Sequence, residues 1–272
     1  MNYIFQKNKN FKKIALFYKK YGFVIIRGLF KKREYDYLDK KISKFSNKHW
    51  HNIMNPDRLD FLIAQSSEKI NSQKTLIKKI EIIEEAATTA KKFRNFLIDN
   101  RVKECLEKTT KKKFNALMMH IIFKQARTKY AKQSWAEHQD NSYAKMKNEG
   151  FVTTNLFIHK ANKENGCIYI YPGSQKKGLY KFERKLGYDY DTSKKERPGN
   201  KTKINLSKFK RIDLNVNSGD FLIMNGNCVH GSYVNKSKTK SRHLISAGYG
   251  ELNKKFNPGI NARRQRIYFN SQ

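Results

Sequence analysis

The feature that most constrains the fold is a change of pattern after Lys113. Downstream of it, short apolar or alternating runs are bounded by Gly, Asn, Pro and Ser, which is typical of short strands joined by turns. Many short strands after a helical segment predict an antiparallel sandwich or barrel flanked by helices, and therefore a mainly β protein. The runs are 116–123, 153–159, 167–171, 211–216, 220–225 and 244–250.

The first third of the chain predicts helices around one early strand. Apolar residues recur at helical spacing in 11–18 and 38–45, and Gly22 is placed to end the first of these helices. The run between them, 23–28, is β-branched and predicts a strand. From Thr75 to Thr109 the spacing is again helical. Its expected buried stripe is Leu76, Ile80, Ile83, Phe93, Leu97 and Leu106.

No internal repeat and no Pro/Gly/Ser-rich linker divides the 272 residues, so we expect one domain over 1–272. Its expected parts are a mostly helical segment 1–113 packed on the core, a β core 114–250, and a basic extension 251–272. Within the core, the lysine-rich stretch 175–210 has no clear strand signal. Long connections of this kind in compact domains are typical of lids and binding loops.

Composition restricts the cellular setting. No run approaches the 18 or more apolar residues of a membrane span, and the N-terminal residues lack the pattern of a secretory signal. Three cysteines with no C-x-x-C pair argue against a disulfide framework and against a structural zinc site. We therefore expect a cytoplasmic protein with no membrane span.

The formal charge of +35 suggests nucleic acid or an anionic membrane surface as a partner. However, Lys far outnumbers Arg, Asn and Ile are also abundant, and the lysines are spread along the whole chain. An AT-rich gene produces this joint excess through codon content alone. The charge therefore predicts a solvated lysine-rich surface, and nucleic acid is not the expected partner.

Two segments combine imidazoles with a carboxylate. In "WAEHQDNSY", His138 and Asp140 stand at i and i+2, and on an extended segment they point to the same side. In "NCVHGS", His230 follows a predicted strand. Two histidines and one carboxylate in this order match the facial triad that binds non-haem Fe(II) and leaves open positions on the metal. Twelve residues later, Arg242 could grip the distal carboxylate of 2-oxoglutarate with its guanidinium.

Each of these residues also has a simpler interpretation. A single buried histidine such as His230 is more often a core residue, and Arg242 alone would be a surface charge. His120 is expected to pack in the core. The joint occurrence in the right order favours a metal site over these separate roles. The remaining histidines, which we expect to be structural or exposed, are His49, His51, His159 and His243.

Four longer segments resemble the phytanoyl-CoA dioxygenase family of Fe(II)/2-oxoglutarate oxygenases. "NKENGCIYIYPGSQKKG" resembles its E-N-G-x-L-x-x-x-P-G-S-H-x-x-G signature, although Gln175 stands where the signature has histidine. The residues from about Lys181 to Lys210 match nothing in the family pattern. The other three segments are "YGFVIIRGLFKKREYDYLDKKI", "EHQDNSY" and "GDFLIMNGNCVHGSYVNKSKTKSRHLISAGY".

The resemblance implies a double-stranded β-helix core of the jelly-roll, cupin-like type. It implies that three residues bind the catalytic iron, namely His138, Asp140 and His230. Arg242 and Ser232 would hold the C5 carboxylate of 2-oxoglutarate, and Gln139 would help to orient the site. Further candidates for cosubstrate contacts are Asn155, Met119 and Lys124.

The implied cofactors are Fe(II), 2-oxoglutarate and O2, with ascorbate supporting the reaction in vitro. Because halogenating relatives have Gly or Ala in place of the carboxylate, Asp140 favours hydroxylation, with release of succinate and CO2.

A small molecule is the expected substrate. The basic residues of the loop, Lys176, Lys177, Lys181, Arg184 and Lys185, favour an anionic one, although a solvated loop is the simpler interpretation. Two alternatives remain open: a 2-oxoglutarate oxygenase that acts on nucleic acid, and a jelly-roll binding module without activity.

Overall fold

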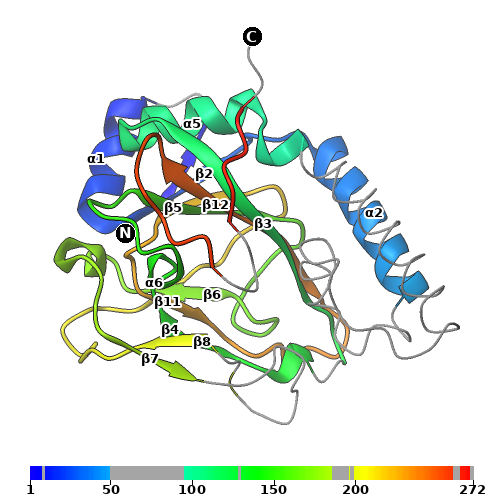
Figure 1. The fold of residues 1–272 in the computed structure, drawn as a ribbon. Helices are drawn as coiled ribbons and strands as arrows, with labels where there is room; N and C mark the ends of the chain where they lie inside the picture. Colours follow the sequence, from blue (N-terminus) through cyan, green and yellow to red (C-terminus); the bar gives the residue numbers. More distant parts are fainter. Residues whose placement is uncertain are drawn as a thin grey trace, which may run out of the picture.

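The computed structural model describes residues 1–7, 10–49, 95–127, 130–185, 196, 199–259 and 264–269. Two β-sheets face each other, and the long helices cover the outer side of the larger sheet (Figure 1). All neighbouring strands pair antiparallel except β1 with β2, which pair in parallel. The larger sheet has the order β1 (Ile4–Gln6), β2 (Phe23–Arg27), β10 (Phe221–Asn225), β5 (Phe151–Phe157), β12 (Arg242–Glu251) and β3 (Phe114–Lys124).

The smaller sheet has the order β4 (Trp135–His138), β11 (His230–Ser232), β6 (Ile168–Ile170) and β9 (Ile212–Asp213). A separate hairpin pairs β7 (Phe182–Lys185) with β8 (Gly199–Thr202). A long excursion of the chain connects β6 to β9, yet these two strands pair directly with each other. Mainly antiparallel strands in two facing sheets confirm the predicted mainly β fold with flanking helices.

Helices α1 (Phe11–Tyr21), α2 (Lys32–His49) and α5 (Asn100–Thr110) cover the larger sheet, and a short helix α6 (Asn141–Ala144) follows β4. Local signals fix the ends of α1. The side chain of Asn10 accepts a hydrogen bond from the backbone N–H of Lys12 at 2.8 Å. Gly22, with φ of 82°, donates its N–H to Tyr18 at 2.7 Å, which confirms the predicted C-terminal glycine.

Alternation along the strands divides the core into two parts. Side chains on one face of the larger sheet pack with the helices and form the helix-facing cluster, which includes Ile14, Leu38, Val102, Ile26, Ile223 and Ile245. Side chains on the other face pack between the sheets and form the inter-sheet cluster, which includes Ile25, Leu222, Leu244, Ile170, Leu214 and Cys228.

At one end of the inter-sheet space the inner face of the larger sheet becomes polar. Leu244 is in the inter-sheet cluster, so Arg242 and Ser246, two residues to either side, share its face. Their partners in the sheet, Lys124 and Asn155, face the same space. Polar side chains are rarely buried unless they have a specific role, so this end of the sandwich is the candidate for a functional site.

Each of the six strand-like runs overlaps an observed strand, in order β3, β5, β6, β9, β10 and β12. The stretch 175–210, which has no clear strand signal in the sequence, nevertheless contains β7 and β8. The side chains that β8 buries are Asn200 and Thr202, so no apolar alternation announced the strand. Residues 186–195 and 197–198, together with most of the helical pattern predicted for 75–109, lie outside the described residues.

Within the described residues, the search for a helix with the length and apolar character to cross a bilayer finds none.

Candidate active site

The pairing of two short strands brings His138 and His230 together. The strands β4 and β11 are antiparallel neighbours, and His230 is the register partner of His138. The two ring centroids are 4.3 Å apart. Gly231, the next residue, permits this close pairing, because a Cβ there would lie 2.6 Å from the carbonyl oxygen of Trp135. The "HGS" sequence therefore has a steric reason for its glycine.

Asp140 lies beside the two histidines, but the backbone that positions it differs from the one predicted. Strand β4 ends at His138, and Asp140 has helical angles (φ −60°, ψ −32°) at the start of α6, so the extended segment expected through both residues is wrong. The carboxylate nevertheless lies between the imidazoles. Its Oδ1 is 3.3 Å from Nε2 of His138, and its Oδ2 is 3.6 Å from Nε2 of His230.

Backbone carbonyls set which nitrogen of each ring is available. Nδ1 of His138 lies 2.7 Å from the carbonyl oxygen of Ala136, and Nδ1 of His230 lies 3.1 Å from that of Cys228. A carbonyl oxygen only accepts, so Nδ1 carries the proton in both rings and a neutral ring keeps its lone pair on Nε2. Both lone pairs then face Asp140. The donor atoms of the three residues, here called the triad, lie within 4.8 Å of one another, and two nitrogens with one oxygen suit a first-row transition ion.

Burial and mutual interaction shift the titration of the triad. Burial lowers the pKa of His230 to about 4. Burial alone would raise the pKa of Asp140, but the neighbouring His230 and His138 hold it below its usual range. For His138, burial acts to lower the pKa, and the contact with Asp140 outweighs it. An ionised carboxylate beside a neutral His230 is the protonation state that metal binding requires.

A second group, here called the basic pocket, consists of Lys124, Arg242 and Ser232. Arg242 is 2% exposed and Lys124 is fully buried, and the two are register partners on β12 and β3. Nζ of Lys124 donates to Oγ of Ser232 at 2.9 Å and also to the carbonyl of Tyr233. Burial, followed by the charge of Arg242, holds the pKa of Lys124 well below its usual value. Two buried cations beside a hydroxyl are suited to binding a carboxylate.

A glycine from the N-G-C sequence completes this pocket. Gly166 accepts a hydrogen bond from Nε of Arg242 at 3.1 Å through its carbonyl. It has φ of 86°, and a Cβ there would lie 3.1 Å from Cδ of Lys124 and 2.8 Å from the carbonyl oxygen of Tyr233. Glycine therefore lets the loop approach both cations closely.

The structure distributes the other predicted cosubstrate residues differently. Asn155 is buried on the inner face of β5. Met119 belongs to the helix-facing cluster, on the opposite face of β3 from Lys124, so the structure does not bring it to the triad. The separation of five positions along one strand explains this, because side chains alternate between faces.

Gln139 is buried, and its amide is bonded to the backbone. Nε2 donates to the carbonyls of Gly178 (2.8 Å) and Asn227 (2.6 Å), and Oε1 accepts from the N–H of Tyr180 at 2.8 Å. These bonds hold the loop after the Pro-Gly-Ser sequence against the strands that carry the two histidines. Gln139 thus positions the loop rather than facing the triad.

Ser174 supports the site, and its role was not foreseen. Its Oγ accepts from the N–H of Val229 at 2.8 Å, one residue before His230. The signal was present, because Ser174 is the serine of the Pro-Gly-Ser sequence. Gln175, the departure from the family signature, is buried beside Gly22, and its Nε2 donates to the carbonyl of Lys19 at 3.4 Å.

The jelly-roll fold together with the two-histidine, one-carboxylate site defines an enzyme class, that of the non-haem iron and 2-oxoglutarate oxygenases. The chain belongs to the phytanoyl-CoA dioxygenase family, whose model matches residues 18–244. A curated relative, phytanoyl-CoA dioxygenase 1 of Oryza sativa subsp. japonica, is 32% identical over 109 residues. That match covers 40% of this chain and 36% of the relative's length.

Solved structures share the fold at low sequence identity. The α-ketoglutarate-dependent epimerase SnoN from nogalamycin biosynthesis is 17% identical, with a TM-score of 0.58 over 90% of this chain and 84% of its own. EctD from S. alaskensis is 11% identical, with a TM-score of 0.62 over 93% and 83%. SnoN has also been solved in complex with Fe3+ and α-ketoglutarate. These likenesses confirm the predicted cupin-like architecture.

Proposed function

We propose that this protein is an Fe(II)/2-oxoglutarate-dependent dioxygenase that hydroxylates a small molecule and releases succinate and CO2. The observation that carries the proposal is the convergence of three donor atoms from His138, Asp140 and His230. It is accompanied by a buried basic pocket. Ser232 of this pocket follows His230 by two residues and is bonded to Lys124, which is the register partner of Arg242.

In this proposal the triad holds Fe(II) through Nε2 of each histidine and a carboxylate oxygen. The donor set fits this ion, since both rings present Nε2 and the carboxylate is ionised. Bound iron, with 2-oxoglutarate and O2, supplies the oxidising chemistry. The carbonyls of Ala136 and Cys228 fix the ring orientations.

The basic pocket would bind the C5 carboxylate of 2-oxoglutarate. Arg242 offers a planar guanidinium, Lys124 a second charge, and Ser232 a hydroxyl. Asn155, on the same inner face, is a further candidate for a cosubstrate contact. Asp140 as the third ligand favours hydroxylation over halogenation.

The finer proposal is an anionic small-molecule substrate. Lys176, Lys177 and Lys181 are exposed, and the loop that carries them is tied to Gln139 at Gly178 and Tyr180. Because Gln139 lies between His138 and Asp140 in the sequence, this attachment brings the basic loop close to the triad. Positive charge near the triad would attract anions.

Anaerobic addition of Fe(II) and 2-oxoglutarate tests the site directly. We expect the wild-type protein to develop the visible charge-transfer absorption of iron chelated by a keto acid, and His138→Ala to lack it. If the folded wild-type protein bound neither Fe(II) nor 2-oxoglutarate, the result would instead favour a binding module without activity.

A succinate-release screen then tests turnover, with Fe(II), 2-oxoglutarate and ascorbate and with His138→Ala as the inactive control. The compounds are amino acids, betaines, phosphonates, acyl-CoAs, and single-stranded DNA and RNA. Succinate formation that shows no preference for anions contradicts the finer proposal, and turnover of nucleic acid alone would favour the nucleic-acid alternative.

A further inference from the structure

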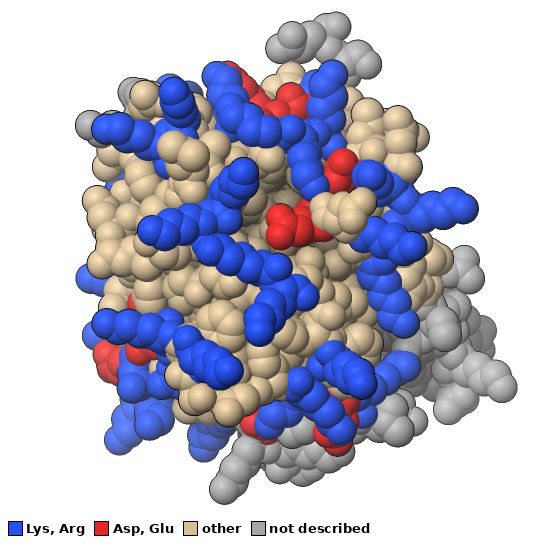
Figure 2. All heavy atoms as spheres, turned by 90° about the vertical axis from the view of Figure 1, so that its left-hand side faces the viewer, with Lys and Arg blue, Asp and Glu red and all other residues tan. Residues whose placement is uncertain are grey.

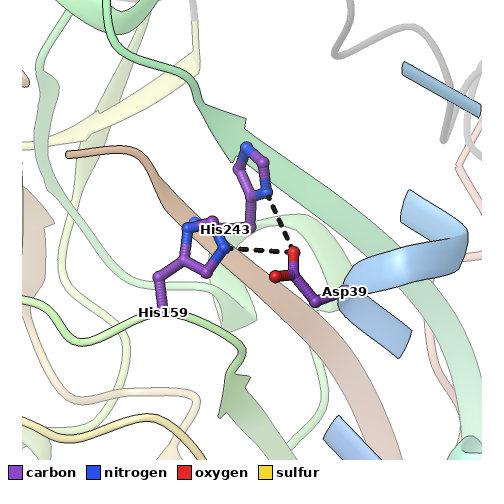
Figure 3. A group of neighbouring side chains, drawn as sticks. All are labelled: Asp39, His159 and His243. Carbon is purple, nitrogen blue, oxygen red and sulfur yellow. Dashed lines mark hydrogen bonds and ion pairs between the residues drawn. The ribbon is translucent and has the colours of Figure 1, made fainter. Parts of the chain in front are cut away.

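A second group of two histidines and an aspartate lies on the other side of the larger sheet. Among the residues that the structure describes, Asp39, His159 and His243 form the one other group whose donor atoms approach within 4.8 Å. Because His243 follows Arg242 on β12, its side chain points to the opposite face, toward the helices. His159 comes just after β5, and Asp39 lies on α2 (Figure 3).

The three side chains converge on one carboxylate oxygen. Oδ1 of Asp39 is 3.0 Å from Nε2 of His159 and 3.9 Å from Nδ1 of His243, and Figure 3 shows both contacts meeting there. The two rings are stacked with centroids 4.4 Å apart. Metal–ligand bonds of about 2.0–2.2 Å place donor atoms about 3 to 3.5 Å apart, so the cluster needs only a small adjustment to share an ion.

The electrostatic surroundings favour the ligand forms of these groups. Burial lowers the pKa of His243, and the hydrogen bond from His159 together with the nearby imidazole of His243 holds the pKa of Asp39 below its usual range. Stacked imidazoles repel each other when both are protonated, which favours at least one neutral ring. Oγ of Ser43 lies 3.4 Å from Oδ1 of Asp39 and can orient the carboxylate.

Solvent can reach the cluster, while His243 anchors it in the sheet. The side chains of Asp39 and His159 are 37% and 26% exposed, and that of His243 is 6% exposed. Water can therefore complete the coordination of an ion held by three protein ligands. Ligation through Nε2 of His159 requires the other tautomer, which gives up the long 3.4 Å hydrogen bond that Nδ1 accepts from the N–H of His243.

We propose that Asp39, His159 and His243 form a second metal site, separate from the triad, for a divalent first-row transition ion. Zinc suits it best, because Zn²⁺ accepts histidine and carboxylate ligands in irregular tetrahedral sites with water as the fourth ligand. The ion would fasten α2 to β5 and β12 at the residue next to Arg242. It would act as a structural cross-link between the helical layer and the strand that carries the basic pocket.

The test removes the triad first, so that its own metal binding cannot interfere. Tag-free His138→Ala/His230→Ala protein is stripped of metal, titrated with Zn²⁺, and assayed for bound zinc and for its melting temperature. We expect one bound equivalent and a rise in melting temperature, because the ion binds the folded state. Asp39→Asn, added to this background, keeps the size of the side chain but loses its charge, and we expect Zn²⁺ affinity to fall at least about 100-fold.

The matched control is Asp36→Asn, on the same helix, where the carboxylate pairs with Lys32 at the surface. It should leave zinc binding unchanged. If the triad-deficient protein does not fold, the same comparison is made in the wild-type background, where Asp39→Asn should lose one of two equivalents. Absence of zinc binding in the folded triad-deficient protein, or equal binding with and without Asp39, would overturn the proposal and leave an ion-paired cluster only.

Discussion

The basic pocket holds two cations that burial alone disfavours. Lys124 is fully buried, the contacts of its Nζ are to neutral oxygens of Ser232 and Tyr233, and the guanidinium of Arg242 is on the neighbouring strand. Removing an ammonium group from water costs several kcal/mol unless it is compensated. A carboxylate bound in the pocket would provide that compensation. The protein should therefore be less stable when the pocket is empty than when a carboxylate is bound.

Replacing Lys124 by Met should therefore separate stability from binding. Lys124→Met keeps most of the aliphatic stem and removes the charge, so we expect a higher melting temperature in the absence of ligand and weaker 2-oxoglutarate binding. Calorimetric melting and 2-oxoglutarate titration of the iron-loaded protein measure the two effects. A variant that is both less stable and unchanged in binding would contradict this role.

The same variant should change how stability depends on pH. The folded-state pKa of Lys124 lies below its ordinary value of 10.5, so the unfolded chain binds the proton more tightly. Wild-type stability then rises as pH increases from the folded pKa toward 10.5, and falls as pH decreases through that window. The advantage of Lys124→Met should be largest at low pH and shrink toward pH 10.5. Melting curves of both proteins across this window measure it.

At the scale of elements, the pairing of β4 with β11 holds the two histidines of the triad in place, and Gly231 leaves no room for a side chain between the strands. In Gly231→Ala the new methyl group would meet the carbonyl oxygen of Trp135 at 2.6 Å and the hydroxyl of Tyr169. Neither strand can move without shifting His138 or His230. We expect a folded protein with Fe(II) affinity reduced by at least about tenfold, since misplaced ligands bind metals poorly.

Iron titration followed by spectroscopy measures this effect. Adding Tyr169→Phe to Gly231→Ala relieves the clash with the hydroxyl but not that with the Trp135 backbone, so it should not restore affinity. Normal iron binding by Gly231→Ala would show that the strand pair tolerates the extra methyl group.

Asp220 joins β10 to β2 and braces the core of the larger sheet. Its two carboxylate oxygens accept from Nε and Nη2 of Arg27, both at 2.7 Å, and Oδ2 also accepts from the N–H of Asn217 at 2.8 Å. Asp220 is 1% exposed, so Asp220→Ala removes a buried carboxylate together with its hydrogen bonds from the partly exposed Arg27 and from the N–H of Asn217. We expect a loss of about 1–3 kcal/mol in the free energy of unfolding.

Denaturant unfolding measures this loss, with Asp36→Ala as control. That exposed residue pairs with Lys32 on one helix, and such pairs contribute about 0–1 kcal/mol. Equal losses for the two substitutions would mean that the bidentate contact does not contribute more than a surface ion pair.

Apolar elements were predictable from the sequence, whereas polar ones were not. β10 and β12 bury side chains on both faces and are recognisable as strands from their apolar runs. β8 buries Asn200 and Thr202. Asn200 donates its backbone N–H to the hydroxyl of Tyr143 and its side-chain amide to Oγ of Ser142, and both bonds depend on tertiary contacts. No local pattern of hydrophobicity reports such contacts.

The candidate site shows the same division. The order of His138, Asp140, His230 and Arg242 could be predicted to form a triad with a basic partner, because residue type and spacing carry that chemistry. The inward orientation of the Lys124 side chain depends on the register of β3. The cluster around Asp39 depends on how α2 packs on the sheet. Residues so distant in sequence become neighbours only through the fold, and His159 and His243 gave no separate signal.

At the scale of the whole molecule, positive charge is distributed rather than gathered. Figure 2 shows Lys and Arg side chains spread over the whole of one face, with Asp and Glu between some of them. The formal charge of +35 must therefore produce self-repulsion over much of the surface. Ion pairs such as Arg101 with Glu34 and Asp99 offset only part of it.

Salt should therefore stabilise the fold. Raising the ionic strength from about 0.01 M to about 0.15 M shortens the screening length from about 30 Å to about 8 Å. We expect the melting temperature to rise over this range, and an uncharged sugar at equal osmolality to have a smaller effect. A melting temperature that falls with added salt would mean that attractive pairs outweigh the repulsion.

The return of the chain to the small sheet has an evolutionary consequence. Strands β6 and β9 are adjacent, with Ile170 opposite Ile212, so the excursion between them leaves and re-enters the sandwich at almost the same place. Between its attachments at Tyr180, whose N–H is held by Gln139, and at Asn200, which is bonded to Ser142 and Tyr143, that excursion can be lengthened, shortened or exchanged while the strands around His138 and His230 keep their positions. Descendants of one ancestral gene could thus acquire new specificities by rewriting a single insertion and inheriting the reactive centre intact.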